Sequence, residues 1–544
     1  MDQQQQPRPV RTIVAWIAVT AILLGFLWLW NTRGDSVRFG QFHDDTIYFA
    51  TAQAISQEGR VTLPSLPGEP DQTKYPPLYP FLLSLVWLVS PQFPGNLTAA
   101  AGISAMLGIA TLIVAFVYLR GWKGVGPGAA VFIVALCASH DAFLLVFSAV
   151  VSETLFIFLA VSAFALGDAQ DRRKTLLAGV IAGLSVLTRP IGIAVAGGIA
   201  FTYLWQRDRT RLAWFSAGFA PFLVLAASFK MILSAPVPDG APEGFRQTWL
   251  YYLDHIGFWR LSVPDLETLV GMLNVNVVEM LAAPAAVTIG SAPGGFLLTL
   301  VWITLSAGIL AGVFRQARAD RLRAPHVALI LHAPFVLLWN YEIGTRLLLT
   351  FQWVFAMGLW IEGGYLIRTF IRNLKGGRAL ADRLVSATGL VIVSVLAIYA
   401  VSAKVERQAA AVAKHPDSFQ DLYQDVYQWV ERNTHPEDRF LAIDDVYLFL
   451  QTGRQAIWPL ALTTEPRFRP DESRLEDQMS RIGDVAEHID ADYLIWTEHD
   501  YAYAPPMKER WGVWAESWPL LMSRDDGKVK VFKLQRKPQE LPGS

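Results

Sequence analysis

The chain has 544 residues, of which 53% are hydrophobic and only 17% are charged. A soluble protein carries about 25% charged residues, so this composition indicates a membrane protein. The formal net charge of −1 gives no support for a nucleic-acid partner, and the single Cys137 excludes an internal disulfide framework and a cysteine-based zinc site.

Long apolar runs recur along the chain as far as residue 403 and then stop. Each run approaches the ~20 residues that a helix needs to cross the hydrocarbon layer, so we expect about 11 transmembrane helices. The first run lacks a small-residue cleavage site and ends in Trp-Leu-Trp, which indicates a retained helix rather than a cleaved signal. The predicted spans are residues 12–31, 97–119, 126–145, 150–167, 175–189, 190–206, 211–232, 293–314, 325–340, 346–367 and 385–403.

The charged residues between these runs predict the orientation. By the positive-inside rule, clusters of Arg and Lys near the ends of the spans are cytoplasmic. We therefore expect a cytoplasmic N-terminus, with the first loop, the long loop 233–292 and the tail after residue 403 on the outer side. The basic clusters are Arg8 and Arg11, Arg120 and Lys123, Arg172 to Lys174, Arg207 to Arg211, Arg315 to Arg323, and Arg368 to Arg383.

This orientation constrains the first loop. Residues 31–75 lie outside and residues 120–123 inside, so only one of the two apolar segments between them, 76–90 and 97–119, can span. The shorter segment opens with proline and is the better candidate for the outer membrane interface. We therefore predict two interfacial helices in this loop, at 45–58 and 77–90.

The long loop and the tail differ in composition. The loop contains Trp249-Leu-Tyr-Tyr-Leu-Asp-His255, from which we take Tyr252 and His255 as candidate substrate-binding residues. Its amphipathic run, Val263 to Met280, is expected to lie along the membrane surface. The tail shows helical periodicity at 419–430 and strand-like runs at 440–443, 493–496 and 528–533. We expect a membrane domain, residues 1–403, and a small external α/β domain, residues 404–544, of about 140 residues.

The first loop opens on an acidic pair, Asp44 and Asp45. One explanation is that one carboxylate caps a helix beginning at Thr46, since Asp is favoured at that position. The other would then lie exposed at the bilayer edge beside His43, where it can deprotonate an acceptor hydroxyl within hydrogen-bond reach. Asp44 and Asp45 are therefore candidate catalytic residues, and His43 and Tyr48 are candidate substrate-binding residues.

Lys74 is the cation of the same loop and precedes Tyr75-Pro-Pro, where the second helix is expected to begin. An external lysine commonly does no more than extend its amino group to lipid head groups. At a helix N-terminus, however, it is a poor partner for the helix dipole and a good one for a phosphate held jointly with free N–H groups. Lys74 is thus a candidate phosphate ligand, and Tyr75 a candidate substrate-binding residue.

Three charged residues lie near the predicted outer ends of later spans: Glu153, Arg189 and Arg346. Glu153 has the alternative of an acidic first turn behind a Ser152 cap, and Arg346 the alternative of pairing with Glu342 across one helical turn. Charges at membrane depth are expensive and tend to be functional. Glu153 is therefore a candidate catalytic residue, and the two arginines are candidate phosphate ligands.

No motif specifies a metal or another cofactor. HExxH, P-loop, GxSxG and Cys/His metal spacings are absent, and the histidines are scattered. His140, in a predicted external turn, is expected to be a solvated loop residue. The acidic pair can still hold a weakly bound divalent cation, because carboxylates suit hard cations.

In their order and spacing along residues 12–370, these motifs resemble the GT-C superfamily of integral membrane glycosyltransferases. The similarity is greatest to protein O-mannosyltransferases and to the bacterial aminoarabinose transferases that act on lipid A. Tyr75 departs from the latter, which have no residue between the lysine and the Pro-Pro pair. The matching pieces are Asp44-Asp-Thr-Ile-Tyr48 with Gly59, Lys74-Tyr-Pro-Pro-Leu-Tyr-Pro80, Ser152-Glu-Thr-Leu-Phe156, Gly183-Leu-Ser-Val-Leu-Thr-Arg-Pro190 and Thr345-Arg-Leu-Leu-Leu349, with a looser match at Trp429-Val-Glu-Arg-Asn-Thr-His-Pro436.

The resemblance implies a GT-C fold, a bacterial inner membrane location and a sugar donor carried on a polyprenyl phosphate. It implies that Asp44 is the catalytic base, that Lys74 binds the donor phosphate, and that Glu153 is the second acidic position of the family. Transfer to a hydroxyl of a lipid, glycan or protein acceptor would invert the anomeric carbon in a single displacement. The alternatives are a polyprenyl-lipid flippase or transporter, and a non-catalytic membrane scaffold; thermal stabilisation by the donor would separate an enzyme from a scaffold.

Overall fold

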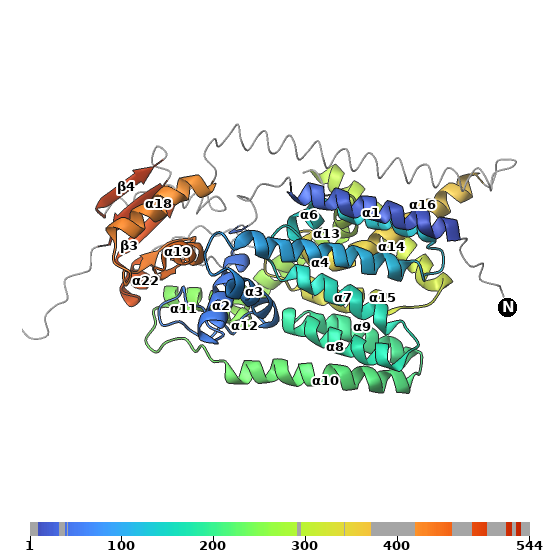
Figure 1. Cartoon of the computed structure of the whole chain (residues 1–544), viewed down its shortest axis with the longest axis horizontal. Helices are drawn as coiled ribbons and strands as arrows, with labels where there is room; N and C mark the ends of the chain where they lie inside the picture. Colours follow the sequence, from blue (N-terminus) through green and yellow to red (C-terminus); the bar gives the residue numbers. More distant parts are fainter. Residues whose placement is uncertain are drawn as a thin grey trace, which may run out of the picture. The chain divides into compact units, whose positions relative to one another are not determined.

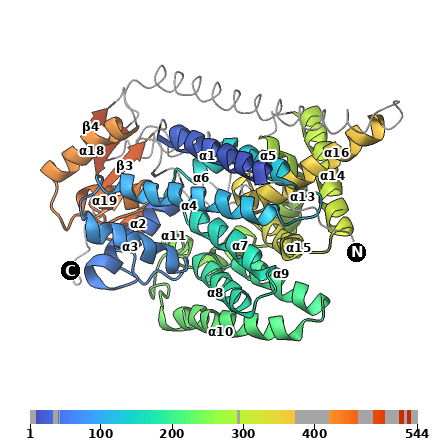
Figure 2. The same cartoon turned by 45° about the vertical axis from the view of Figure 1, so that its right-hand side comes forward.

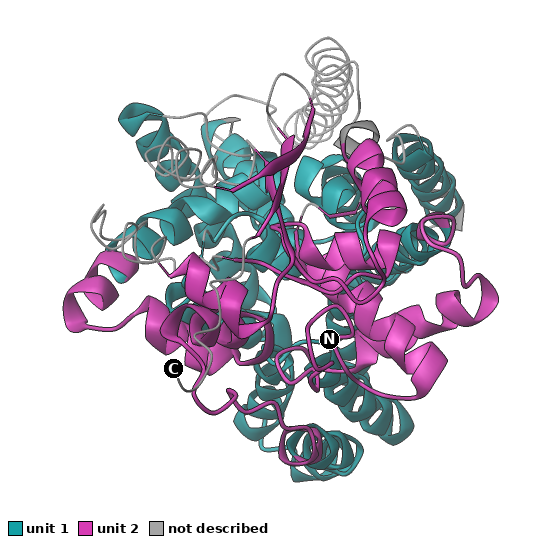
Figure 3. Cartoon of the chain, turned by 90° about the vertical axis from the view of Figure 1, so that its left-hand side faces the viewer, with its two compact units in different colours: residues 1–38, 99–227, 273–411 teal, residues 39–98, 228–272, 412–544 magenta. Residues whose placement is uncertain are grey.

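The structure, a computed structural model, describes residues 9–31, 39–40, 42–290, 295–341, 343–371, 419–459, 481–497, 518–524 and 529–534. The chain divides into two compact units, coloured separately in Figure 3. Unit 1 comprises residues 1–38, 99–227 and 273–411, and unit 2 comprises residues 39–98, 228–272 and 412–544. The predicted domain boundary near residue 403 and the predicted span 385–403 lie outside the described residues.

Unit 1 is helical. Of the helices in the described part of the chain, six are long and apolar enough to cross a membrane, and α3, α5, α7, α9 and α15 are apolar but shorter. Figures 1 and 2 both show α7, α8 and α9 packed side by side. The helices of unit 1 are α1 (Pro9–Asn31), most of α4 (Leu97–Leu119), α5 (Pro127–Ser139), α6 (Asp141–Val146), α7 (Glu153–Gly167), α8 (Arg172–Thr188), α9 (Gly192–Trp205), most of α10 (Arg209–Ile232), most of α13 (Leu266–Ile289), α14 (Phe296–Ala319), α15 (Ala324–Leu337), the 3-10 helix η2 (Arg346–Phe351) and α16 (Gln352–Ile371).

Glycines allow two of these helix pairs to pack backbone against backbone. A Cβ added at Gly179 of α8 would lie 2.2 Å from the carbonyl oxygen of Phe215 in α10. One added at Gly312 of α14 would lie 2.0 Å from the carbonyl oxygen of Gly358 in α16. Close approach through small residues drives helix association in membranes, where lipid is as apolar as leucine.

Several helix ends that the charge pattern predicts to be cytoplasmic meet in unit 1. Asp168, which follows α7, pairs with Arg323 at the start of α15 and accepts a hydrogen bond from the Tyr118 hydroxyl at 3.0 Å. Arg323 also donates to the carbonyl of Gly121, just after α4, at 3.4 Å. The basic residues after α4 and after α14 therefore lie at the same end of the helices, as the charge pattern predicts.

The predicted span 126–145 is wrong as a single helix, because the chain breaks at His140 into α5 and α6. His140 has an extended backbone, and its Nδ1 accepts a hydrogen bond from the amide of Ala142 at 3.1 Å, so it caps α6. Its Nε2 lies 2.9 Å from the carbonyl oxygen of Ala286. His140 is 7% exposed, so its expected place in a solvated turn is also wrong.

The predicted surface run Val263 to Met280 is wrong in extent. Its residues from Leu266 onward belong to α13, a 24-residue helix that is long and apolar enough to cross a membrane. One polar position of this run has defined partners. The Asn276 amide donates to the carbonyls of Leu337 and Trp339 at 2.9 Å and 2.8 Å.

Unit 2 contains the two helices predicted for the first loop, here α2 (Asp44–Glu58) and α3 (Leu78–Val89). α2 is buried at almost every position from Asp45 to Ala54, since α3 and α19 pack on it. The Trp87 indole donates to the carbonyl of Phe49 at 3.1 Å across the α2–α3 contact. The remaining helices of this unit are α11 (Glu243–Leu253), α12 (His255–Ser262), α18 (Phe419–Asn433), α19 (Asp445–Thr452) and α22 (Ile482–His488).

The outward side of α3 carries an apolar stripe. Phe81, Leu85, Leu88 and Val89 follow one another at helical spacing and are 42 to 87% exposed. Such a stripe on a soluble surface would be unfavourable, whereas in a membrane interface it contacts lipid. This pattern favours the interfacial position predicted for the helix.

The tail forms a five-stranded mixed sheet in the order β2-β1-β3-β5-β4. β1 is parallel to β2 and β3, and β5 is antiparallel to β3 and β4. The three predicted strand runs are confirmed as β1 (Phe440–Leu441), β3 (Tyr493–Thr497) and β5 (Val529–Lys533); β2 (Ala456–Ile457) and β4 (Leu520–Arg524) complete the sheet. The amide of Ala456 donates to the carbonyl of Ser65 at 3.0 Å, which ties the sheet edge to the first loop.

Candidate active site

Unit 2 brings together several of the residues that the sequence singles out. His43, Lys74 and Tyr75, all from the first loop, contact or neighbour Tyr251 of α11, and Tyr75 also binds Asp44. The same group of side chains includes Tyr252 of α11 and Asp445 of α19. Three segments distant in sequence therefore build one polar cluster.

Asp44 is held by Tyr75, the residue between Lys74 and the Pro-Pro pair. The Tyr75 hydroxyl donates a short hydrogen bond to Oδ1 of Asp44. Burial and the charge of Asp44 raise the pKa of Tyr75 well above its ordinary value, so the phenol stays protonated and remains a donor. The helix begins at Asp44 itself, with His43 at the N-cap and no side-chain capping bond, so neither aspartate caps a helix at Thr46 in the expected way.

Asp45 occupies a different environment. It is fully buried, and its carboxylate accepts hydrogen bonds from the amides of Gly40 and Thr46, both at 2.9 Å. Burial raises the pKa of Asp45 to about 7, although these two amides act in the opposite direction. The two adjacent carboxylates are thus divided between an inner one that fixes the loop and an outer, half-buried one bound to Tyr75.

Lys74 lies in an aromatic environment. Its ammonium group is 4.4 Å from the ring centre of Tyr251 and 4.9 Å from that of Tyr75, and it donates to the carbonyl of Tyr251 at 2.7 Å. Burial lowers the pKa of Lys74 to about 8, partly opposed by the charge of Asp44. The amino group therefore has defined partners within unit 2, in contrast to the alternative of free extension to lipid head groups.

His43 connects the first loop with the tail. Its Nε2 lies 3.0 Å from Oδ1 of Asp445, and its Nδ1 lies 3.0 Å from the hydroxyl of Tyr251. The Tyr252 hydroxyl donates to the other carboxylate oxygen of Asp445. His43 has a positive φ of 56°, a conformation that is uncommon for residues other than glycine and is found at functional sites.

The other two predicted substrate-binding residues lie on α2 and at the start of α12. Tyr48 is buried on α2, with its ring centre 4.8 Å from that of Tyr75 and 5.3 Å from that of Tyr79. His255 begins α12, directly after the helix that carries Tyr251 and Tyr252, and is half-buried. The ring of Tyr48 thus packs against the ring of Tyr75.

Sequence reasoning missed Asp445 and Tyr251. Asp445 belongs to a second acidic pair, Asp444-Asp445, that follows a predicted strand directly. Burial raises the pKa of Asp444 to about 6. Acidic residues at the carboxyl end of a parallel strand are a recognised site signal, but nothing in the sequence shows that this strand faces the first loop.

Unit 1 contains the second group of predicted residues. Glu153 pairs with Arg189 through one carboxylate oxygen and with Arg346 through the other, both at 2.6 Å. Ser152 makes no capping bond; instead its hydroxyl accepts a hydrogen bond from Arg189 at 3.1 Å. Glu342, the alternative partner of Arg346, lies outside the described residues. One buried carboxylate thus bridges two guanidinium groups.

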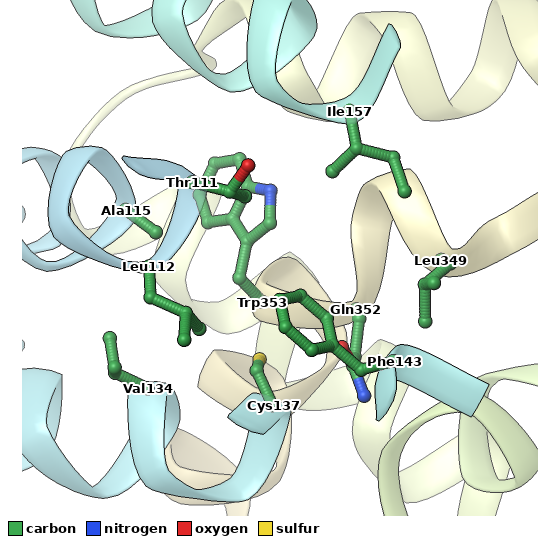
Figure 4. A pocket seen from close by; sticks show the side chains of 10 residues that line it. All are labelled: Thr111, Leu112, Ala115, Val134, Cys137, Phe143, Ile157, Leu349, Gln352 and Trp353. Carbon is green, nitrogen blue, oxygen red and sulfur yellow. The ribbon is translucent and has the colours of Figure 1, made fainter. Parts of the chain in front are cut away.

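Two other features of the described residues are less suited to chemistry. No group of three or more His, Cys, Asp or Glu side chains is placed to hold a metal ion. A small cavity in unit 1, shown in Figure 4, is lined mainly by apolar side chains such as Ile157, Leu349 and Trp353 around Cys137. This lining suits packing rather than the binding of a charged group.

Comparison with known proteins finds similarity to solved structures but no match to a family model or a curated sequence. Two crystal structures of ArnT from Cupriavidus metallidurans are similar to it, one bound to undecaprenyl phosphate and one in the apo state. Both give a TM-score of 0.53 at 12% sequence identity, with 95% and 96% of this chain and 97% and 98% of ArnT covered.

At this level of identity the likeness establishes the fold. The chain is a mostly helical, polytopic membrane protein with an ArnT-like GT-C fold and a small C-terminal mixed sheet. The fold class predicted from the sequence is confirmed, and the similarity extends over nearly the whole of both chains.

Proposed function

We propose that this protein is a glycosyltransferase that moves a sugar from a polyprenyl-phosphate donor to an acceptor hydroxyl at the outer face of a bacterial inner membrane. The ArnT-like fold supports a transferase of this class, and one ArnT structure is described as bound to undecaprenyl phosphate. The acceptor hydroxyl belongs to a lipid, a glycan or a protein.

The observation that carries this proposal is that one residue, Tyr75, contacts both the Asp44 carboxylate and the Lys74 ammonium group. Tyr75 binds Asp44 with its hydroxyl and faces the ammonium group of Lys74 with its ring. Displacement of a phosphate by a hydroxyl requires a base on the attacking oxygen and positive charge on the leaving group. Asp44 and Lys74 provide these two groups within one unit.

The proposed reaction is a single displacement with inversion. The acceptor oxygen attacks the anomeric carbon while the Asp44 carboxylate takes its proton, and the bond from that carbon to the phosphate oxygen breaks. The phosphate leaves with the bonding electrons and needs no general acid, because its charge is stabilised by the Lys74 ammonium group. Asp45, engaged by two backbone amides, positions the loop rather than reacting.

Unit 1 offers its own candidate anion site. The guanidinium groups of Arg189 and Arg346 meet at Glu153, and arginine presents a planar fork of donors that suits a phosphate oxygen. In this proposal Glu153 orients the two guanidinium groups instead of transferring a proton. The polyprenyl tail keeps the donor at the membrane, which agrees with the exposed apolar stripe on α3.

The test is transfer by purified protein from a polyprenyl-phosphate sugar, with Asp44→Asn as the decisive variant. Loss of the base should lower kcat by about 10³-fold, within the range for general base catalysis, while donor binding and thermal stability are retained. Asp239→Asn, which neutralises an exposed carboxylate of unit 2, is the matched control and should turn over normally.

Asp45→Asn separates the two carboxylates. It leaves a backbone amide without its acceptor, so it should lower stability by about 1–3 kcal/mol, with the folded fraction still active. Full turnover by Asp44→Asn would refute its role as base. Mass analysis of the lipids and glycans of the cell envelope, with and without the protein, would identify the sugar and the acceptor.

A further inference from the structure

Tyr251, His43 and Asp445 form a continuous hydrogen-bonded chain in unit 2. The Tyr251 hydroxyl and the Asp445 carboxylate lie on opposite nitrogens of the His43 ring, each at 3.0 Å. The chain runs from a ring that covers Lys74 to a carboxylate contributed by the tail. Its geometry is that of hydroxyl, imidazole and carboxylate groups that share protons.

Asp445 is the most buried of the three residues. The side chain of Asp445 has no exposed area, whereas that of His43 is 19% exposed. Tyr251 is 8% exposed and contacts Lys74, which is only half-buried. Asp445 therefore cannot touch a substrate and can act only through His43 and Tyr251.

The direction of the Tyr251 O–H bond depends on the charge of His43. A carboxylate only accepts hydrogen bonds, so Nε2 of His43 carries a proton toward Asp445. When the imidazole is neutral, Nδ1 has no proton and must accept that of Tyr251. When the imidazole is protonated, Nδ1 donates to the Tyr251 oxygen, and the Tyr251 proton turns away from His43.

We propose that Asp445 is a positioning residue of the donor site, which keeps His43 protonated so that the Tyr251 hydroxyl donates to the donor phosphate beside Lys74. This inference rests on the proposed function and adds to it a role for the C-terminal tail. The tail would then contribute to donor binding through His43 and Tyr251. Tyr251 would supply the phosphate with a neutral donor next to the Lys74 cation.

The surroundings of His43 favour its protonated form. Burial by itself lowers the pKa of His43, but the hydrogen bond and charge of Asp445, together with the charge of Asp44, raise it above its ordinary value, against the opposing charge of Lys74. Asp445 is held in turn by the Tyr252 hydroxyl, whose pKa burial and Asp445 raise well above its ordinary value, so that Tyr252 remains a donor. Among the described residues, the titratable or charged groups around His43 are Asp44, Asp45, Lys74, Tyr251, Tyr252, Asp444 and Asp445.

The experiment combines two readouts on the full-length protein. Histidine-labelled protein is titrated by NMR, with the His43 signal assigned from its loss in His43→Gln. Binding of undecaprenyl phosphate is measured over the same pH range. Wild-type binding should weaken as pH rises through the His43 transition. In Asp445→Asn that transition should move down by at least about one pH unit, and binding at pH 7 should fall about tenfold, the size expected for one hydrogen bond to a charged group.

A double-mutant cycle tests whether Asp445 acts through Tyr251. Tyr251→Phe should weaken undecaprenyl phosphate binding about tenfold at low pH and remove the effect of His43, so Asp445→Asn should add little to it. A merely structural role for Asp445 predicts additive losses and binding by Asp445→Asn that is not recovered at low pH. Asp492→Asn, at a tail carboxylate near β3, is the control and should bind normally.

Each negative result has a definite meaning. An unchanged His43 transition in Asp445→Asn overturns the proposal, and so does a shifted transition with unchanged binding. Absence of undecaprenyl phosphate binding by the wild-type protein at every pH overturns the proposed donor class. In that case the NMR transition still reports whether Asp445 controls His43, so the two failures are distinguishable.

Discussion

Lys74 and Tyr75 are adjacent in sequence, but their side chains have different partners in the site. The lysine turns its ammonium group toward two tyrosine rings and a carbonyl oxygen, whereas the tyrosine turns its hydroxyl to Asp44. Tyr75, which lies between the lysine and the prolines, thus orients the Asp44 carboxylate, the base of the proposed reaction. It connects the two candidate functional groups.

The charge of Lys74 predicts how donor use depends on pH. Its pKa is lowered to about 8 by burial, so the amino group is charged below that pH and neutral above it. The kcat/KM for the donor should therefore fall as pH rises through about 8. In Lys74→Arg this fall should disappear, because a guanidinium group stays protonated throughout the range.

Comparison of Lys74→Arg with Lys74→Met provides the controls. Lys74→Met should be poor at every pH, since it has no charge to lose, and its KM for the donor should rise more than its kcat falls. A pH profile of Lys74→Arg that still declines near pH 8 would show that another group is responsible. The step expected from His43 should remain visible in both variants at lower pH.

Among the elements, α14 and α16 show the physical basis of packing in unit 1. Gly312 and Gly358 place the two backbones in contact, where any side chain would force the helices apart. No hydrophobic effect holds two helices together inside a bilayer, so close packing has to do so. The apolar runs of the sequence therefore predict the helices, while a few small residues decide how they pack.

Gly312→Ala tests this packing. Its Cβ would lie 2.0 Å from the carbonyl oxygen of Gly358, so the helices must separate or bend. We expect a loss of about 1–3 kcal/mol, typical of overpacking, measured as reduced stability to heat or denaturant in detergent.

Gly308→Ala is the matched control, one turn earlier on the same helix, where no heavy atom lies within 4 Å of the added Cβ. It should be neutral or slightly stabilising, because alanine favours helix more than glycine does. Equal losses in the two variants would mean that α14 and α16 do not pack in this way in the membrane.

For the whole molecule, α13 raises a question of topology. The basic clusters at residues 207–211 and 315–323 are both predicted to be cytoplasmic, and α10 and α14 are long and apolar enough for the two crossings that this requires. A third full crossing by α13 would place one basic cluster outside. By charge, α13 should therefore enter the membrane without completing a crossing, despite its length.

Accessibility of single cysteines decides this point. Asp239→Cys and Ser291→Cys, before and after α13, should both react with an impermeant maleimide added from the outer side. Arg318→Cys should react only from the inner side. Native Cys137 is buried and should stay silent in all three variants.

Reaction of Ser291→Cys from the inner side alone would contradict the prediction. It would show that α13 crosses completely and that the positive-inside rule fails for the segment 290–323. Asp239→Cys and Arg318→Cys fix the two sides independently of α13, so the experiment also tests the proposed orientation of the chain.

Sequence alone determined the class of the protein and most of its elements. Long apolar runs, basic residues between them and proline or glycine at their ends are local signals, so they predicted α2, α3, α4 and the three main strands of the tail. The order of weak motifs also identified the GT-C fold. Glu153, Arg189 and Arg346 were selected as charges at membrane depth, although which residues they pair with was not visible.

Tertiary structure decided the contacts between distant segments. Asp445 lies 402 positions after His43, and no periodicity or spacing relates two residues so far apart. The break at His140 and the contacts of Asn276 in α13 involve hydrogen bonds to distant segments, because polar groups inside a membrane protein must find partners there. Local sequence therefore placed an acidic pair and a lysine near a membrane. Only the fold showed that Tyr75 joins them and that the tail reaches the same site, since this depends on packing between segments.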